Sequence, residues 1–249
     1  MNILSLTNIS RNFGQVTALK GIDLEVAPGE LRAVIGPNGA GKTTLFNLVS
    51  GAFPPSSGEI RFNGELINRL SPEKRVHAGI VRTFQITEVF LELTVSDNLR
   101  VAVETAMHFN RWPFISAAKR KVVQERIDDL IESTQLGGKE DRIVGELAHG
   151  DQRVVEVAIA LAMDPRLLML DEPTAGMGDT ETEHMVRLIR HLHDERGVPM
   201  LFIEHDMNLI FDIADRITVL DNGSFLAEGT PDDIKGNEDV QAAYLGGAA

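Results

Sequence analysis

Short apolar segments separated by glycine and proline fill the first third of the chain. Apolar and polar positions alternate within most of them, which is the two-residue period of strands with one buried face. A Pro-Gly pair at residues 28–29 and a Pro-Pro-Ser-Ser-Gly run at 54–58 separate neighbouring segments, as turn residues do. We therefore predict strands at residues 3–9, 18–26, 31–35 and 59–63.

The apolar period becomes helical between residues 95 and 136. Thr94 precedes an apolar run in the way that a helix-capping residue does. Residues 117–134 carry apolar side chains at helical spacing, and the run closes at the Gly-Gly pair 137–138. The pattern predicts a mainly helical insertion over about residues 87–149.

Helices and strands alternate over the rest of the chain. The segment 167–170 is apolar throughout, as expected of a strand that is covered on both faces. Strands alternating with helices form a parallel sheet with helices on both faces. The predicted helices lie at 152–163, 180–195 and 207–214, and the predicted strands at 167–170, 199–203 and 217–220. This order indicates the α/β class with a parallel core sheet.

Composition narrows the class of protein further. The 249 residues are 43% apolar, which is enough for a core, and none is cysteine, which excludes disulfides, thiolate nucleophiles and Cys-bound zinc. A net charge of −13 argues against a large nucleic-acid footprint or adsorption to anionic lipid. No stretch approaches the roughly 18 apolar residues that cross a bilayer, and the N-terminus lacks a signal-peptide pattern. We expect a cytoplasmic chain that reaches a membrane only through another protein.

One loop carries a complete phosphate-binding motif, G-x-x-x-x-G-K-[ST], between the predicted strand 31–35 and a helical run at 44–50. Its glycines allow backbone N–H groups and the helix dipole to point at a phosphate. Lys42 would neutralise β- and γ-phosphate charge, and the Thr43 hydroxyl would ligate Mg²⁺. A simple glycine-rich turn is the weaker interpretation, given the strand–loop–helix setting. The predicted nucleotide-binding residues here are Gly36, Pro37, Asn38, Gly39, Ala40, Gly41, Lys42, Thr43 and Thr44.

Two carboxylates, Asp171 and Glu172, follow the apolar strand 167–170. The carboxyl end of a parallel strand faces the crevice where α/β sheets bind ligands, so Asp171 can reach the Mg²⁺ shell through water. Glu172 can polarise an attacking water as general base. The alternative is a solvated turn after a buried strand, and the phosphate loop upstream favours the catalytic interpretation.

With both motifs located, the chain resembles the nucleotide-binding subunit of an ABC transporter over nearly its whole length. The resemblance implies a P-loop NTPase cassette built as one domain, with an N-terminal antiparallel β subdomain. Residues 1–86 and 150–249 would form the catalytic core and β subdomain, and residues 87–149 a helical subdomain that ends at the signature. It also implies ATP hydrolysis with Mg²⁺ by two cassettes that enclose two nucleotides between them.

The resemblance assigns further side chains. Phe13 stands where an aromatic residue of the family stacks on adenine, and Gln85 matches the Q-loop glutamine at the metal and γ-phosphate site. His205 matches the switch histidine, which contacts the γ-phosphate and positions water and Glu172. The implied catalytic residues are therefore Lys42, Glu172 and His205, and the implied metal site is Thr43, Gln85 and Asp171.

The signature and the D-loop depart from the family pattern. Ala148, His149, Gly150 and Asp151 stand where the family usually has Ser-Gly-Gly-Gln, and they would face the nucleotide of a partner cassette. Ala148 lacks the serine hydroxyl, and a lost hydrogen bond to a charged group is worth roughly 1.5 to 3 kcal/mol. We hypothesise weaker ATP-driven dimerisation at such a site. Gly178 holds the usual aspartate position of the D-loop, so no D-loop role is assigned.

The relaxed signature, the switch segment 204–207 and the closing segments 228–231 and 243–246 resemble the branched-chain amino-acid uptake group, in particular its longer ATPase subunit. This implies an importer for branched-chain amino acids or related small polar solutes of the urea or amide type. Its partners would be transmembrane permeases, a second ATPase subunit and, indirectly, a solute-binding protein, at the cytoplasmic face of the membrane and without nucleic acid. Open alternatives are the ATPase of an export system such as lipopolysaccharide extraction, and a non-transport ABC ATPase.

Overall fold

An antiparallel sheet forms from the N-terminal part of the chain. The structure is a computed structural model that describes residues 2–83, 89–109 and 116–245. The sheet has the order β2-β1-β4-β5 and consists of β1 (Leu4–Phe13), β2 (Val16–Val26), β4 (Ser57–Phe62) and β5 (Glu65–Leu66). Apolar residues of β1 and β2 are buried at roughly alternate positions while polar residues between them stay exposed, as the sequence period requires.

The larger sheet has the order β10-β9-β3-β8-β7-β6. Every neighbouring pair in it is parallel except β10 and β9, which are antiparallel. β3 and β7 are buried along their whole length, because helices or the other sheet cover both of their faces. The strands are β3 (Leu31–Ile35), β6 (Ile80–Arg82), β7 (Leu167–Asp171), β8 (Met200–Ile203), β9 (Arg216–Asp221) and β10 (Ser224–Gly229).

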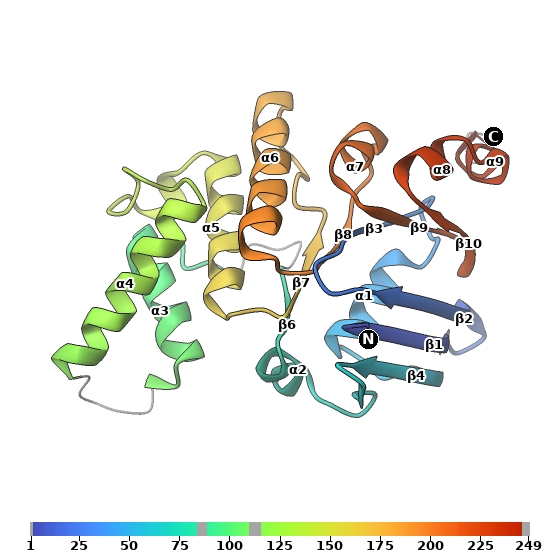
Figure 1. Cartoon of the computed structure of the whole chain (residues 1–249), viewed down its shortest axis with the longest axis horizontal. Helices are drawn as coiled ribbons and strands as arrows, with labels where there is room; N and C mark the ends of the chain where they lie inside the picture. The colour runs from blue at the N-terminus through green and yellow to red at the C-terminus, as the bar shows by residue number, and fades with distance from the viewer. Residues whose placement is uncertain (1, 84–88, 110–115, 246–249) are drawn as a thin grey trace.

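Helices cover the larger sheet and extend beyond it on one side (Figure 1). Three helices pack together at that side: α3 (Val95–Ala106), α4 (Ala117–Ser133) and α5 (His149–Ala162). A short 3-10 turn, η2 (Val144–Glu146), lies between α4 and α5. The remaining helices are α1 (Lys42–Ser50), α2 (Pro72–Ala78), α6 (Asp179–Arg196), α7 (Met207–Ile213), α8 (Pro231–Lys235) and α9 (Glu238–Leu245). Within the described ranges, no helix has the length and apolar content that crossing a bilayer demands.

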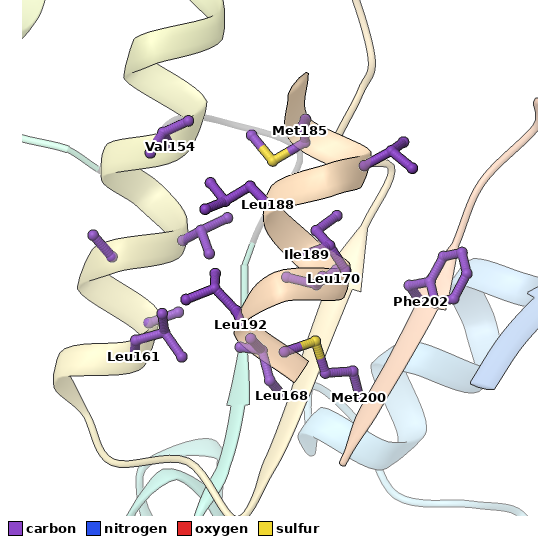
Figure 2. Packing of buried hydrophobic residues seen from close by; sticks show 14 of the residues in the cluster. Val154, Leu161, Leu168, Leu170, Met185, Leu188, Ile189, Leu192, Met200 and Phe202 are labelled. Carbon is purple, nitrogen blue, oxygen red and sulfur yellow. The ribbon is translucent and has the colours of Figure 1, made fainter. Parts of the chain in front are cut away.

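The larger sheet separates two apolar cores. Leu168 and Leu170 of β7 join the core formed with α5 and α6, whereas Leu167 and Met169 join the core beneath α1 and the antiparallel sheet. Figure 2 shows the first core, where Val154 and Leu161 of α5 meet Leu188 and Leu192 of α6 above the strands. This double burial explains why β7 has no polar position before its last residue.

Most predicted elements are present with shifted ends. α5 begins at His149 rather than at residue 152, so the signature residues form its first turn. The sequence pattern does not predict α2, β5, β6, β10, α8 and α9, which are short and carry little periodic signal. The predicted parallel core is present in β9, β3, β8, β7 and β6, and the structure adds β10 as an antiparallel edge strand beside β9.

Candidate functional site

The phosphate loop curls around the side chain of Lys42. Lys42 Nζ donates to the carbonyl oxygens of Gly36 at 2.6 Å and Pro37 at 3.1 Å. Gly39 and Gly41 have φ values of 80° and 101°, in the left-handed region that favours glycine. Gly41 is also the N-cap of α1, so the loop leads directly into the positive end of a helix. This arrangement suits an anion.

The loop lines a hollow of about 220 Å³ that it shares with residues from the ends of two strands. Lys42 is only 6% exposed, and burial lowers its pKa below the ordinary value of 10.5, while the Glu172 carboxylate acts in the opposite direction. The lining residues are Ala18, Asn38, Gly39, Ala40, Gly41, Lys42, Thr43, Thr44, Glu172 and His205. The structure thus brings the predicted loop, the predicted base and the predicted histidine together.

Glu172 and His205 face each other across the mouth of this hollow. His205 Nε2 lies 2.7 Å from Glu172 Oε1, and the Glu172 N–H donates to the carbonyl oxygen of Ile203. Glu204, which was not singled out from the sequence, is 7% exposed and accepts from both the N–H and the hydroxyl of Thr174. The ends of β7 and β8 are therefore fastened to each other, which fixes the separation of Glu172 and His205.

Asp171 lies beside the hollow in a buried ion pair with Arg82 of β6. Arg82 Nη2 lies 2.5 Å from Asp171 Oδ2, and the two side chains are 6% and 4% exposed. Arg82 Nη1 donates to Asn47 Oδ1 at 2.7 Å and to Ser50 Oγ at 3.1 Å, both on α1. One guanidinium thus joins β6, β7 and the helix that follows the phosphate loop. Nothing in the local sequence pattern singles out Arg82.

The signature residues lie at the start of α5, away from the phosphate hollow. Ala148 is the N-cap of α5 and forms no side-chain cap hydrogen bond, whereas Asp151 Oδ1 accepts from Lys139 Nζ at 2.6 Å. His149 Nε2 lies 3.3 Å from the carbonyl oxygen of Ala175 in the predicted D-loop. The signature therefore packs on the D-loop of its own chain.

Gly150 packs against the first turn of α6. A Cβ at Gly150 would lie 3.1 Å from Glu181 Oε1, and Glu181 Oε2 accepts from the N–H of Gly178. The signature borders a separate hollow of about 310 Å³ lined by Lys139, Ala148, Gly150, Asp151, Val154, Thr180, Glu181, His184 and Met185. Within one chain, therefore, the structure does not bring the signature to the phosphate loop.

Phe13 is 45% exposed and forms a small aromatic cluster outside the lining of the phosphate hollow. Its ring meets the Phe53 ring edge to face at 5.3 Å, and the Arg11 guanidinium lies 4.6 Å from both ring centres. Phe53 and Arg11 were not identified from the sequence. The predicted Gln85 lies outside the described residues.

Comparison with known proteins identifies the family. The ABC transporter family matches residues 19–175 of the chain. The chain belongs to that family. Members are ATPases, so the family implies binding and hydrolysis of ATP by this ABC ATPase. A second family, described as branched-chain amino acid ATP-binding cassette transporter, matches residues 226–249.

Individual relatives narrow the group within the family. The high-affinity branched-chain amino acid transport ATP-binding protein BraF of Pseudomonas aeruginosa is 40% identical, over 99% of this chain and 98% of its own. LivG of Escherichia coli K12, which carries the same description, is 38% identical over 99% and 98%. The ADP conformation of MJ1267, an ATP-binding cassette of an ABC transporter, superposes with a TM-score of 0.84 at 28% identity, covering 99% of both chains. The predicted group and fold are confirmed.

Proposed function

We propose that this ABC ATPase hydrolyses ATP to drive an importer of branched-chain amino acids or related small polar solutes. The observation that supports this best is the Glu172–His205 pair at the mouth of the phosphate hollow, 2.7 Å apart and held beside Lys42. BraF and LivG, both full-length relatives, are named for branched-chain amino acid transport. We extend that substrate class to this chain, and with it an import role.

In the proposed reaction, Glu172 accepts a proton as the oxygen of water attacks the γ-phosphorus and the bond to the β–γ bridging oxygen breaks. The products are ADP and inorganic phosphate. His205 orients the water and Glu172, and Lys42 exchanges its two carbonyl contacts for the β- and γ-phosphates. The N–H groups at the start of α1 bind the phosphates, and Phe13 offers an aromatic face to the adenine.

The donors near this hollow fit Mg²⁺, which prefers oxygen ligands. The Thr43 hydroxyl lines the hollow, and the Asp171 carboxylate lies next to Glu172 at the end of β7. We assign both to the metal site, together with Gln85. Bound Mg²⁺ supplies neutralisation of phosphate charge.

We propose that a second ATPase subunit completes the site. Because the signature residues of one chain border a different hollow from its phosphate loop, a partner chain must bring its own signature to the nucleotide. Ala148, His149, Gly150 and Asp151 would serve the partner's nucleotide in the same way. ATP bound between two subunits would favour the closed pair, and loss of the γ-phosphate would release it.

A groove of about 270 Å³ between α2, β6 and α5 is the proposed contact with a membrane-spanning permease. Its lining is mainly apolar and includes Val76, Val81, Ile159 and Met163, which suits a short amphipathic segment at the cytoplasmic face of the permease. Arg82 also lines this groove and contacts Asp171. A permease segment in the groove would thus be linked to the proposed metal site through the Arg82–Asp171 ion pair. The proposed location is the cytoplasmic face of the membrane.

The test is ATP turnover and solute uptake in vesicles that contain candidate permease subunits together with a solute-binding protein for branched-chain amino acids. We expect Glu172→Gln to bind ATP and to lose turnover by about a hundredfold or more, the range that general bases contribute. Glu183→Gln is the matched control, because Glu183 is an exposed carboxylate on α6. Absence of turnover in the wild type, or full turnover in Glu172→Gln, contradicts the proposal.

A further inference from the structure

Glu204 is a buried carboxylate at the point where β8 ends. It is 7% exposed and directly precedes His205 in the chain. Its Oε1 accepts from the N–H of Thr174 at 2.9 Å and from the Thr174 hydroxyl at 2.6 Å. Its Oε2 accepts from the backbone N–H of His205 at 3.1 Å. The two oxygens of one carboxylate thus hold two different loops of the nucleotide site.

The first of these loops carries Glu172. β7 and β8 pair in parallel as far as Asp171 and Ile203, so the two loops leave the sheet side by side. Glu172 is the next residue of the first loop, and Thr174 follows two positions later. Because Thr174 donates to Glu204 from both its N–H and its hydroxyl, the chain just beyond Glu172 is fastened to the end of β8.

The backbone of Glu172 needs such support. Its φ is 49°, in the left-handed region that residues other than glycine seldom adopt. A conformation of this kind persists only where the contacts around it hold it in place. The Glu172 N–H donates to the carbonyl oxygen of Ile203 at 3.0 Å, and the Glu172 carbonyl oxygen accepts from the N–H of Ala175 at 3.1 Å. Residues 172–175 therefore form a tight turn, and the bonds between Thr174 and Glu204 attach that turn to β8.

The second loop carries His205. The His205 side chain is 50% exposed, against 19% for Glu172, so packing restrains the imidazole less than it restrains the carboxylate. The bond from the His205 N–H to Glu204 fixes the backbone from which the imidazole extends. His205 Nε2 then lies 2.7 Å from Glu172 Oε1. Glu204 therefore supports both sides of the contact between Glu172 and His205.

We infer that Glu204 is a positioning residue for ATP hydrolysis, which holds Glu172 and His205 in their mutual orientation. The inference rests on the proposed function, in which these two residues act on the attacking water. Glu204 is absent from the described residues that line the phosphate hollow. Its replacement should therefore slow the chemical step and leave nucleotide binding unchanged. Displacing a reacting group by about 1 Å can cost roughly a hundredfold in rate.

The first arm of the test compares ATP turnover by the wild type and by Glu204→Gln in the vesicles described above. Glutamine has the size of glutamate, and its amide oxygen can still accept from Thr174, but its amide nitrogen then faces the His205 N–H, donor to donor. We expect kcat to fall about ten- to hundredfold. KM for ATP, and the affinity of the full chain for Mg²⁺–ADP measured by calorimetry, should stay within about twofold of the wild type. Glu183→Gln, at an exposed carboxylate of α6, is the control and should match the wild type in all three quantities.

The second arm changes Thr174 and leaves the carboxylate in place. Thr174→Val removes the hydroxyl and keeps the N–H, so kcat should fall about three- to tenfold, as the net loss of one hydrogen bond implies. Thr174→Ser keeps the hydroxyl, so its kcat should stay within about twofold of the wild type. Valine and serine alter the volume of this half-buried site little, so the pair tests the inference even where Glu204→Gln does not fold.

Three results overturn the inference while leaving the proposed function intact. The first is wild-type kcat in Glu204→Gln or in Thr174→Val, and the second is an equal loss of kcat in Thr174→Val and Thr174→Ser. The third is a fall in affinity for Mg²⁺–ADP as large as the fall in kcat, because that indicates a general loss of structure. Absence of turnover in the wild type contradicts the proposed function and the inference together.

Discussion

Arg82 and Asp171 form an ion pair, between Nη2 and Oδ2, that is almost completely removed from solvent. Removing one partner of a buried pair leaves a charge without compensation and typically costs about 3 to 5 kcal/mol. We therefore expect Arg82→Met to lower the free energy of unfolding by that amount. Urea denaturation followed by circular dichroism measures the change.

The double variant Arg82→Met/Asp171→Asn provides the control, because it removes both charges. Its unfolding free energy should lie well above that of Arg82→Met alone, since no uncompensated carboxylate is left buried. If Arg82→Met costs less than about 1 kcal/mol, the value typical of exposed pairs, the pair does not stabilise the end of β7 as described.

Ala148 offers a test of the relaxed signature. It is the N-cap of α5, with φ −58° and ψ 153° and no side-chain cap, so Ala148→Ser should raise the unfolding free energy of the single chain by about 1 kcal/mol. The same hydroxyl should strengthen ATP-driven dimerisation. Urea denaturation measures the first effect, and sedimentation in the presence of ATP, in a Glu172→Gln background, measures the second.

Ala148→Asp separates these two effects. Aspartate caps a helix as well as serine does, but its charge repels a γ-phosphate. We expect Ala148→Asp to stabilise the single chain and to weaken the ATP-bound dimer. Unchanged dimer affinity and unchanged turnover in Ala148→Ser would show that the missing hydroxyl does not limit dimerisation.

Local sequence patterns predicted the phosphate loop, the carboxylates at the end of β7 and the order of most elements, because each depends on residues close together in the chain. The phosphate loop and Glu172 belong to this class. His205 required the family resemblance, since one histidine after a strand carries little signal by itself. Arg82 could not be predicted from local pattern, because its partner Asp171 is 89 residues away and exists as a neighbour only after β6 and β7 pair. Tyr244 is similar, since its packing on the core of the larger sheet depends on where α9 docks.

If a permease segment packs in the apolar groove, a substitution there should disrupt association with the permeases without changing nucleotide affinity. Ile159 of α5 is partly buried and lines the groove, so Ile159→Glu places a charge where a permease segment would pack. We expect affinity for Mg²⁺–ADP within about twofold of the wild type, and loss of stable association with the permeases. Val122→Glu, at a 47% exposed apolar position on α4, is the control. Retained association of Ile159→Glu with the permeases contradicts the proposed groove contact.

Alkaline pH should weaken the fold through Tyr244, the single tyrosine of the chain. Burial raises its pKa to about 12, from an ordinary value of 10.0, so the folded state holds the phenolic proton more tightly than the unfolded state. The contribution is complete below about pH 10 and is lost as pH rises from 10 towards 12. Burial lowers the pKa of Arg75 to about 10, and that group acts in the opposite direction over the same range.

The difference in unfolding free energy between wild type and Tyr244→Phe therefore isolates the phenol, because Arg75 is common to both. This difference should decline steadily above pH 10, while phenolate absorbance of the folded wild type rises only near pH 12. A phenolate transition near pH 10 in the folded protein would show that Tyr244 is solvated and that α9 does not pack on the core.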